Sequence, residues 1–389
     1  MVKIDPYNIK EKYLRWKEKA LKEGISGLSS ANSQIIMQYS QDMERGLNVA
    51  ISNKKGARSY IRLNVISIRL VYLAKAFEKL YSTDLIQISE LQISAFFADM
   101  RNGSIRRKDG QQFKAVADYV KDFKAFWHWY MKVNRKKDID VKDITLDLDT
   151  GRDKPEWVYL TEDQIKQLTS NAEYKYEVLI WFLFDTGIRA PTELVNIKVS
   201  DFLNDFKELN IREETSKTFG RRIKIMLCSN LIRDYVKYKK LQPHDYLFKI
   251  CPGSANRVLK RLAKRVLGDK ESLAGQKYSQ LTMYDFRHNS CCYWLPRYKS
   301  ESALKYRFGW RKSDKIHYYS EMLGMRDTIS EEDMLLDVTK TEIEQKLETS
   351  NKEKMIMQDE INSLQSQIVT ITELTKELFA KMKQNQVIQ

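Results

Sequence analysis

A glycine turn followed by an arginine is the first pattern in this sequence that could do chemistry. In Thr186-Gly187-Ile188-Arg189 the arginine stands at the expected start of a new helix. The exposed amides of a helix N-terminus and a guanidinium group both attract phosphate, so the pattern indicates a phosphate site. The alternative is an arginine that only caps the helix, and the pattern alone does not separate the two.

Three further patterns follow in chain order. Residues 215–222 place Lys217 beside a β-turn, where the simpler interpretation is a basic hairpin tip that touches the phosphate backbone of a nucleic acid. Residues 284–288 bring an aromatic residue, an acid, an arginine and a histidine close together. Residues 308–310 then carry Phe-Gly-Trp, and residues 317–319 carry His-Tyr-Tyr. The order of these patterns is more specific than any one of them.

The order and spacing resemble the catalytic domain of the tyrosine recombinases, the phage integrase and Xer superfamily. That family has an arginine in a T-G-x-R-x-x-E-L box, a lysine on a β-hairpin, an H-x-x-R-H box, and a tyrosine nine residues after the histidine or tryptophan of a third box. Here the interval of nine from Trp310 selects Tyr319 over Tyr318. The resemblance covers about residues 155–325 and implies these catalytic residues: Arg189, Lys217, Tyr284, Arg287, Trp310 and Tyr319. It implies supporting roles for Glu193 and His288.

The resemblance also implies a reaction and its partners. The two arginines would hold the non-bridging oxygens of a DNA phosphodiester while Tyr319 attacks and becomes linked to the 3′-phosphate. Lys217 would protonate the departing 5′-oxygen. Because transesterification keeps the bond energy in the phosphotyrosine, no metal, ATP or other cofactor is expected. The implied function is site-specific recombination or integration of double-stranded DNA, by a tetramer acting on two duplexes.

Two positions depart from the family pattern. Glu193 stands four residues after Arg189 instead of three, which weakens its expected role of steadying that arginine. Tyr284 occupies the place of the second-box histidine. A phenol, with an ordinary pKa of ~10, can donate a hydrogen bond to phosphate but cannot act as a base near neutral pH. Two other functions stay open: a DNA-relaxing enzyme of the type IB topoisomerase kind, and a DNA-binding relative that has lost activity.

The composition fits a protein that binds DNA. Lysine and arginine number 67 against 52 acidic residues, which gives a net charge of +15 and a pI near 9.3. Such an excess attracts polyanions, and nucleic acid is the first candidate. A membrane surface is the rival, but no apolar run approaches the ~18 residues that a spanning helix requires. The N-terminus also lacks the layout of a signal peptide.

The cysteines indicate an intracellular protein. They have neither a CxxC pair nor zinc-site spacing, and they are Cys228, Cys251, Cys291 and Cys292. We therefore expect reduced, buried thiols and no metal site. The expected location is cytoplasmic, in association with the nucleoid.

Hydrophobic periodicity predicts a mainly α-helical chain with a small antiparallel β-sheet in the catalytic domain. The expected division is a charged N-terminal helix (1–30), a helical core-binding domain that contacts DNA (31–140), a linker (141–158), an α+β catalytic domain (159–329) and a coiled-coil tail (330–389). The sheet is expected from two alternating runs, which contain Leu209 and Ile211, and Ile223, Ile225 and Leu227.

Several helix boundaries and faces follow from local signals. Thr161 with Gln164 three residues later predicts a helix start, and an apolar helix from Tyr174 should end at Gly187. Another helix is expected over residues 86–100. A single buried face is expected for Leu63, Ile66, Ile68, Leu70, Leu73 and Phe77.

Two basic surfaces are expected to contact DNA. One is the charged face of a helix whose other side is apolar, with Arg257, Lys260, Arg261, Lys264 and Arg265. The other is a glycine-containing loop with Arg106, Arg107 and Lys108, which would let the helical domain approach from the opposite side as a clamp. Such residues supply salt-dependent affinity without selecting a sequence. The alternative for the helix is a charged face that only meets solvent.

The tail carries apolar residues at alternating steps of three and four. They are Ile343, Leu347, Met357, Ile361, Leu364, Ile368, Ile371, Leu378 and Met382. This seam, with polar flanks, predicts a coiled coil through which copies of the chain would associate. The alternative is a single amphipathic helix packed on the rest of the protein.

Overall fold

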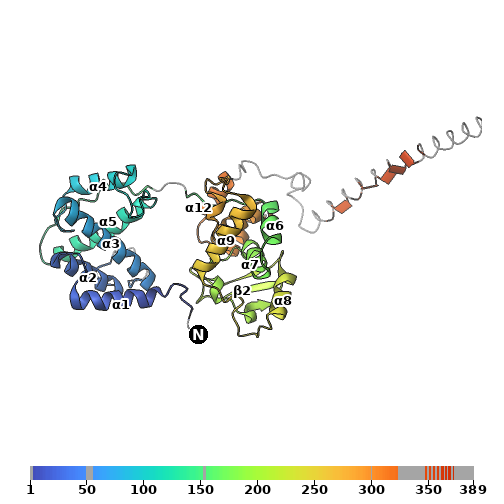
Figure 1. Cartoon of the computed structure of the whole chain (residues 1–389), viewed down its shortest axis with the longest axis horizontal. Helices are drawn as coiled ribbons and strands as arrows, with labels where there is room; N and C mark the ends of the chain where they lie inside the picture. Colours follow the sequence, from blue (N-terminus) through green and yellow to red (C-terminus); the bar gives the residue numbers. More distant parts are fainter. Residues whose placement is uncertain are drawn as a thin grey trace, which may run out of the picture. The chain divides into compact units, whose positions relative to one another are not determined.

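The computed structural model describes residues 3–49, 56–151, 155–298 and 300–322, together with single positions between 347 and 371. The described chain divides into two compact units, Met1–Ser313 and Asp314–Gln389. The first part of unit one is all helical (Figure 1). Its helices are α1 (Ile9–Glu23), α2 (Ser30–Arg45), α3 (Tyr60–Tyr81), α4 (Glu90–Asn102) and α5 (Val116–Arg135).

Serine caps and aromatic packing shape this helical region. Ser29, Ser59 and Ser89 each accept a backbone hydrogen bond at the start of α2, α3 and α4. The core between the helices is rich in phenylalanine, and the rings of Phe77 and Phe96 meet edge to face at 5.0 Å. The core also takes in residues of α1, and it extends to Leu148 in the segment that follows α5.

Two local expectations for this region were wrong. Helix α4 begins at Glu90, not at residue 86, because Ser89 and Gln92 form a capping box that fixes the start. Ile68 is 59% exposed, whereas Ile66 and Leu70 on the same helix are buried. Ile68 stands two residues from each, and two residues turn a helix by roughly 200°, away from the core.

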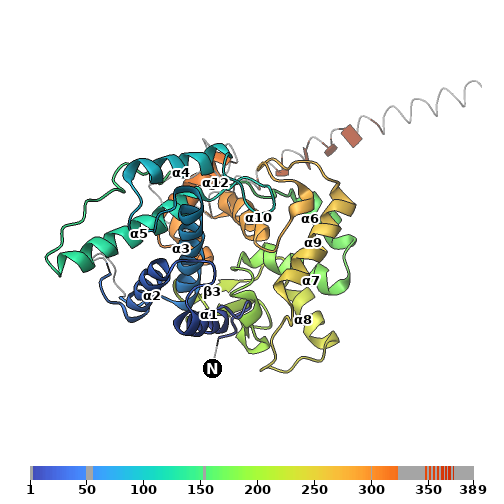
Figure 2. The same cartoon turned by 60° about the vertical axis from the view of Figure 1, so that its left-hand side comes forward.

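The elements of unit one from residue 162 to residue 308 build an α+β region. Its helices are α6 (Glu162–Ser170), α7 (Tyr174–Thr186), α8 (Ser229–Tyr238), α9 (Pro252–Leu267), α10 (Asp285–Trp294) and α11 (Glu301–Phe308), whereas α12 (Asp314–Met322) belongs to unit two. Four short 3-10 turns accompany them: η1 (Leu194–Asn196), η2 (Val199–Asp201), η3 (Tyr278–Gln280) and η4 (Leu295–Arg297). The strands are β1 (Phe202–Leu203), β2 (Glu208–Ile211) and β3 (Arg221–Lys224). Helices α6, α7 and α9 lie side by side (Figure 2).

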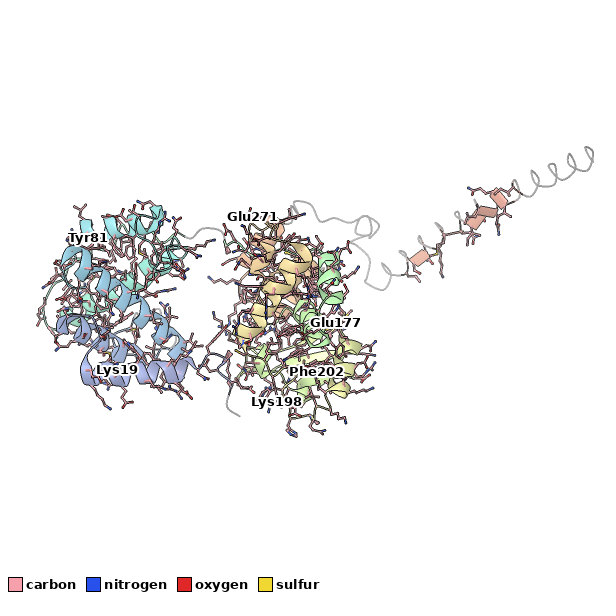
Figure 3. All side chains as sticks on the ribbon, viewed as in Figure 1. Lys19, Tyr81, Glu177, Lys198, Phe202 and Glu271 are labelled. Carbon is pink, nitrogen blue, oxygen red and sulfur yellow. The ribbon has the colours of Figure 1, made fainter. Side chains whose placement is uncertain are left out.

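The sheet is small and antiparallel, in the order β1-β2-β3. Leu209 pairs with Ile223, and Ile211 pairs with Arg221, so one face of β2 and β3 points into the core. Phe202 of β1, at the edge of the sheet, is labelled in Figure 3. Its ring packs against Phe182, with the ring centres 6.2 Å apart. This sheet and the surrounding helices confirm the predicted fold class.

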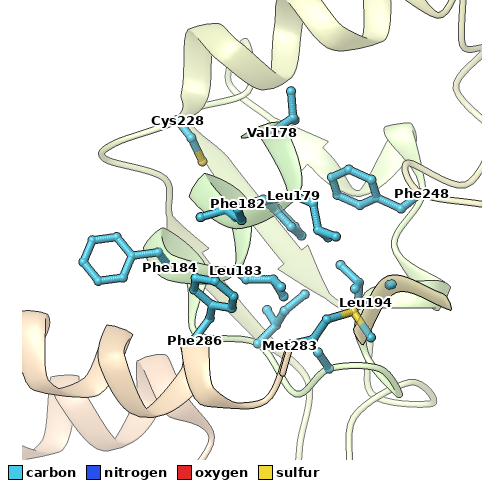
Figure 4. Close-up of a cluster of buried hydrophobic side chains, with 14 of the residues drawn as sticks. Val178, Leu179, Phe182, Leu183, Phe184, Leu194, Cys228, Phe248, Met283 and Phe286 are labelled. Atoms are coloured by element: carbon cyan, nitrogen blue, oxygen red, sulfur yellow. The ribbon is translucent and has the colours of Figure 1, made fainter. Parts of the chain in front are cut away.

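Helix α7 runs through the core of this region. Its residues Val178 to Phe184 are buried except for the half-buried Trp181, and they pack with Phe248 and Phe286 from later in the chain (Figure 4). The helix begins and ends near the predicted positions, and the capping box of Thr161 at the start of α6 is present. A helix that is apolar on nearly all sides is stable only inside a core, so α7 is a rigid base for the loop that follows it.

Three cysteines are buried free thiols, as expected, but Cys251 is exposed at the start of α9. Within the described ranges, no cluster of three or more His, Cys, Asp or Glu side chains could hold a metal ion. Within the same ranges, no helix has the length and apolar character needed to cross a membrane.

Most of the predicted coiled coil lies outside the described residues. Six seam positions that are described are helical, with side chains 47–63% exposed: Leu347, Met357, Ile361, Leu364, Ile368 and Ile371.

Candidate active site

The turn after α7 presents Arg189. Helix α7 ends at Gly187, whose φ of 57° lies in the left-handed region that favours glycine. A Cβ at this position would collide with the Phe308 ring and lie 2.7 Å from Ser290 Oγ, so no larger residue fits. Beyond the turn, the Arg189 guanidinium donates to the carbonyl of Gly309 at 2.8 Å. The end of a rigid helix therefore aims this arginine at the loop that follows α11.

Glu193 holds Arg189 in spite of the extra residue between them. Its carboxylate accepts from the Arg189 backbone N–H at 2.9 Å and from the Arg189 guanidinium at 2.8 Å. The side chain of Glu193 is fully buried. Burial raises its pKa, but hydrogen bonds and charge from Arg221 and Arg189 outweigh this and bring the pKa to about 2. Glu193 is therefore an anion at neutral pH.

Arg287, on α10, is the second arginine of this cluster. It is 4% exposed, and its guanidinium donates to the carbonyl of Gly187 at 2.5 Å and to that of Phe308 at 2.6 Å. Burial and the neighbouring charge of Arg189 lower the pKa of Arg287 to about 10, so it remains protonated at neutral pH. Two guanidiniums that repel each other in a poorly hydrated place favour the approach of an anion.

Trp310 and Gly309 complete this cluster. The Trp310 ring stacks on Phe308 at 4.9 Å, and the Arg287 guanidinium lies 5.9 Å from the Trp310 ring centre. Gly309 has a φ of 61°, and a Cβ there would approach the Arg189 guanidinium to 3.2 Å. The absence of a side chain at this position lets the arginine reach the backbone.

Lys217 lies on the loop between β2 and β3, and its side chain is exposed. The next residue ties this loop to the cluster, because the Thr218 hydroxyl donates to the Gly309 carbonyl at 2.9 Å. The Thr218 carbonyl also accepts from Arg311 at 2.9 Å. Lys217 is thus one residue from an anchor point of the arginine cluster.

Tyr284 and His288 lie at the start of α10, on the helix that carries Arg287. Tyr284 is 48% exposed, and its ring meets the edge of His288 at 5.3 Å. His288 in turn stacks on Trp157 at 4.8 Å. Tyr284, His288 and Trp157 thus form a row of ring contacts, and about half of the Tyr284 surface stays exposed.

Tyr319 lies on α12, which belongs to the second compact unit. It is 3% exposed, and its ring packs against the edge of Tyr318 at 5.1 Å. Tyr318 is half-buried. The two adjacent tyrosines therefore differ in exposure as well as in their distance along the chain from Trp310.

The basic residues of α9 lie opposite its buried face, which contains Leu259 and Leu262. Arg257, Arg261, Lys264 and Arg265 are exposed, and Lys260 is half-buried. Three of these side chains already have local partners, because Arg257 donates to Ser254, Lys260 to Gln280 and Arg265 to the Asn171 carbonyl.

The basic loop after α4 is organised partly by its own arginine. Arg106 donates to the carbonyls of Gly103 and Gly110, which closes the loop on itself. Arg107 forms an ion pair with Asp109 at 3.0 Å, and Arg107 and Lys108 are both exposed. Charge on this loop is therefore available at its surface.

Arg221, which no sequence pattern singled out, belongs to the same cluster. Arg221 is the first residue of β3 and is paired with Glu193 at 2.9 Å with no exposed side-chain surface. Strand alternation could have found it, since residue 221 has the same parity as the inward-facing Ile223 and Ile225.

The two-arginine cluster lies within a stretch of the chain that matches a known family. Residues 158–323 match the phage integrase family. This stretch of the chain is therefore similar to the catalytic domain of that family. Curated proteins of known function yield no match to the sequence.

Solved structures share the fold at low sequence identity. A fragment of the Tn1549 transposon integrase in complex with circular intermediate DNA is 16% identical, with a TM-score of 0.53, over 74% of this chain and 94% of that chain. A lambda integrase dimer bound to a core site is 11% identical, with a TM-score of 0.52, over 80% of this chain and 86% of that one. The XerH recombinase in a post-cleavage complex is 14% identical, with a TM-score of 0.50, over 82% and 94%.

Proposed function

We propose that this chain is a site-specific DNA recombinase or integrase that cuts and rejoins strands through a phosphotyrosine at Tyr319. The observation that carries the proposal is the meeting of Arg189, Arg287 and Trp310 around the backbone of residues 308–309. The described geometry offers donors for a phosphate, and the matched family supplies the reaction.

The arginine cluster would act on the charge of the transition state. Attack on a phosphodiester increases negative charge on the non-bridging oxygens, which Arg189 and Arg287 would stabilise. Both arginines are already held by carbonyls, so little reorganisation is needed when DNA binds. The Trp310 N–H and the Tyr284 hydroxyl are further donors, and Tyr284 takes this role without acting as a base.

The covalent step exchanges one phosphoester for another. The Tyr319 hydroxyl releases its proton to water as its oxygen bonds to phosphorus, the bond to the 5′-oxygen breaks, and Lys217 gives that oxygen a proton. In the second step a free 5′-hydroxyl attacks the phosphotyrosine and releases Tyr319. The number of phosphoester bonds is unchanged, so the proposal needs neither ATP nor a metal ion as a reactant.

The test is trapping of a covalent protein–DNA adduct on a suicide substrate that carries a cognate site. We expect an adduct with the wild-type chain, loss of it in Tyr319→Phe, and retention of it in Tyr318→Phe. A Tyr318→Phe variant that loses the adduct while Tyr319→Phe keeps it would reassign the nucleophile. Absence of any adduct would leave a DNA-binding protein without strand-transfer chemistry, and supercoil relaxation without strand exchange would favour a topoisomerase.

We also propose that the α9 surface contacts the DNA backbone. Removing two of its exposed charges in Arg261→Ala/Lys264→Ala should lower the slope of log K against log salt by about 2, because each phosphate contact releases about one counterion. The matched control is Lys237→Ala/Lys240→Ala, which removes two exposed charges at and just beyond the end of α8. Equal slopes for the two double variants would contradict a DNA-facing role for α9.

We further propose that the tail joins copies of the chain by a coiled coil. The support is the apolar seam, whose described members are helical and exposed. Replacing Ile361 and Ile368 by Glu should reduce the mass measured by sedimentation. The control is Glu at Asn362 and Gln365, which are also helical and exposed but lie outside the seam. If both variants sediment like the wild type, the tail does not hold the assembly together.

A further inference from the structure

Arg221 stands where the fold would ordinarily place an apolar side chain. Along β3 the side chains alternate between buried and exposed, and Arg221 takes a buried position, like Ile223. Burying a guanidinium costs several kcal/mol unless its charge is paired and its donors are used. Arg221 therefore needs an anionic partner whose attraction offsets the loss of hydration.

Glu193 is that partner. The two guanidinium nitrogens of Arg221 donate to the two carboxylate oxygens at 3.1 Å and 2.9 Å, and its Nε donates to the carbonyl of Arg307 at 2.8 Å. Ser216 adds a contact to each partner, at 3.3 Å to Glu193 and 3.4 Å to Arg221. Such a bidentate pair fixes the plane of the carboxylate as well as its position.

The same carboxylate also pairs with Arg189, so one anion is bound to two cations. Arg189 uses one oxygen of Glu193 for its guanidinium and the other for its backbone N–H. If Glu193 were paired with Arg189 alone, it would neutralise that arginine. With Arg221 present, the three groups together carry one net positive charge. Arg189 therefore remains attractive to a phosphate.

Gly309 shows how close the two arginines lie. A Cβ built on Gly309 would be 3.0 Å from a nitrogen of Arg221 and 3.2 Å from a nitrogen of Arg189. The carbonyl of Gly309 accepts from Arg189, and that of Arg307 accepts from Arg221. The end of α11 is thus bound by both guanidiniums.

We propose that Arg221 is a positioning residue for the phosphate site, which orients Glu193 and leaves the charge of Arg189 available to the scissile phosphate. The inference rests on the proposed function. It gives Arg221 no contact with DNA, and it assigns its effect to the orientation and charge of Arg189. The competing account is a buried ion pair that only stabilises the fold.

The test compares the full chain with Arg221→Met, Arg221→Lys, Glu193→Gln and the double variant Arg221→Met/Glu193→Gln. Three quantities are measured: the single-turnover rate of adduct formation on the suicide substrate, the Kd for DNA, and the melting temperature. We expect Arg221→Met to lower the adduct rate more than about 10-fold and to change Kd much less. Arg221→Lys keeps the charge but not the bidentate geometry, so its rate should be intermediate.

The double variant separates positioning from folding. Glutamine at 193 no longer neutralises Arg189, so the double variant should form the adduct faster than Arg221→Met alone. The matched control is Arg69→Met, which breaks a largely buried ion pair with Asp122 in the helical domain. We expect that control to lower the melting temperature and leave the adduct rate of the folded protein unchanged.

Three results would overturn the inference. The first is a wild-type rate in folded Arg221→Met, and the second is a rate loss no greater than that of Arg69→Met at equal stability. If Arg221→Met does not fold, a folded Arg221→Lys with the wild-type rate is the third. Stabilisation of the DNA-free chain by inorganic phosphate gives a readout without catalysis. If the wild type forms no adduct but phosphate stabilises it and not Arg221→Met, the proposed function fails and the positioning role stands.

Discussion

Glu193 and Asp185 are two buried carboxylates of the α+β region that are paired with arginines, and their surroundings differ. Glu193 receives two guanidiniums, from Arg189 and Arg221. Asp185 receives one, from Arg307 at 2.9 Å. The backbone N–H groups of residues 226–228 also donate hydrogen bonds to the Asp185 carboxylate, at 2.6–3.2 Å.

The two carboxylates consequently differ in their electrostatics. Burial raises the pKa of Asp185 above 3.8 in spite of the opposing charge of Arg307. Burial also acts on Glu193, but two guanidiniums outweigh it and bring that pKa to about 2. Of these two buried acids, the one with two guanidiniums has the lowered pKa and the one with a single guanidinium has the raised pKa.

The two pairs also differ in what lies beyond them. Arg307 is buried, donates to the carbonyls of Asp185 and Lys224, and lies 4.3 Å from the ring centre of Trp294. Its donors therefore tie α7, α11 and the end of β3 together within the protein. Arg189 is partly exposed and has an outer face that a ligand could reach. Two ion pairs of the same kind thus differ in what surrounds them, since one arginine is enclosed by the fold and the other keeps a partly exposed side chain.

The largest expected effects come from breaking each pair at its arginine. Arg189→Met should lower the adduct rate by ~100- to 1,000-fold, as expected for loss of a transition-state donor, with little change in melting temperature. Arg307→Met leaves Asp185 without its cation and should cost about 3–5 kcal/mol of stability. The measurements are single-turnover adduct formation and urea unfolding. If folded Arg307→Met were as slow as Arg189→Met, the division between site and scaffold would be wrong.

Acid should sharpen the contrast between the two carboxylates. Glu193 has a pKa of about 2 in the folded chain against 4.5 for an ordinary glutamate. Its ionised form therefore stabilises the fold above about pH 4.5, and on the order of 3 kcal/mol is lost as the pH falls towards 2. The acid limb of the stability curve is the fall in the free energy of unfolding below about pH 4.5. Glu193→Gln should flatten this limb in urea unfolding measured at a series of pH values.

Asp185→Asn is the control for the acid experiment. A raised pKa in the folded state means that protonation of Asp185 favours the fold. Its contribution to the slope of unfolding free energy against pH is therefore opposite in sign to that of Glu193. Removing it should leave the acid limb at least as steep as in the wild type. Equal flattening by both variants would show that the two carboxylates do not differ in the way described.

The smallest expected effect concerns the glycine between the two guanidiniums of the Glu193 cluster. Gly309→Ala places a Cβ within 3.0–3.2 Å of Arg221 and Arg189 and keeps a left-handed backbone. A shift of a few tenths of an ångström should lower the adduct rate about 10-fold. Gly268→Ala is the matched control, because its φ is 81° and nothing lies within 4 Å of its Cβ. Equal rate losses would assign the effect to backbone strain alone.

Features that depend on local chemistry could be predicted from the sequence. Thr161 and Gln164 form the predicted capping box, and α7 ends at Gly187, because caps and glycine turns need only a few neighbouring residues. The alternation around Leu209 and Ile223 predicted the paired strands in the same way. The family pattern also located Arg189 and Arg287, which the fold brings to adjacent carbonyls.

The rest depended on contacts between distant residues. The interval between Arg189 and Glu193 suggested a weakened pair, but the carboxylate is held in place by Arg221 from another strand. Arg221 looked like part of a basic hairpin tip, since only its partner distinguishes it from the exposed Arg222. Local charge does not reveal whether an arginine faces solvent or an acid.

The carbonyl contacts of Arg189 and Arg287 affect the entropy change of DNA binding. A free arginine side chain loses up to about 2 kcal/mol of rotamer freedom when it is ordered. In this protein the carbonyls of Gly187, Phe308 and Gly309 have already restricted both side chains. That loss occurs when the chain folds, so phosphate binding should carry a smaller entropic penalty than at a surface where flexible arginines gather around DNA.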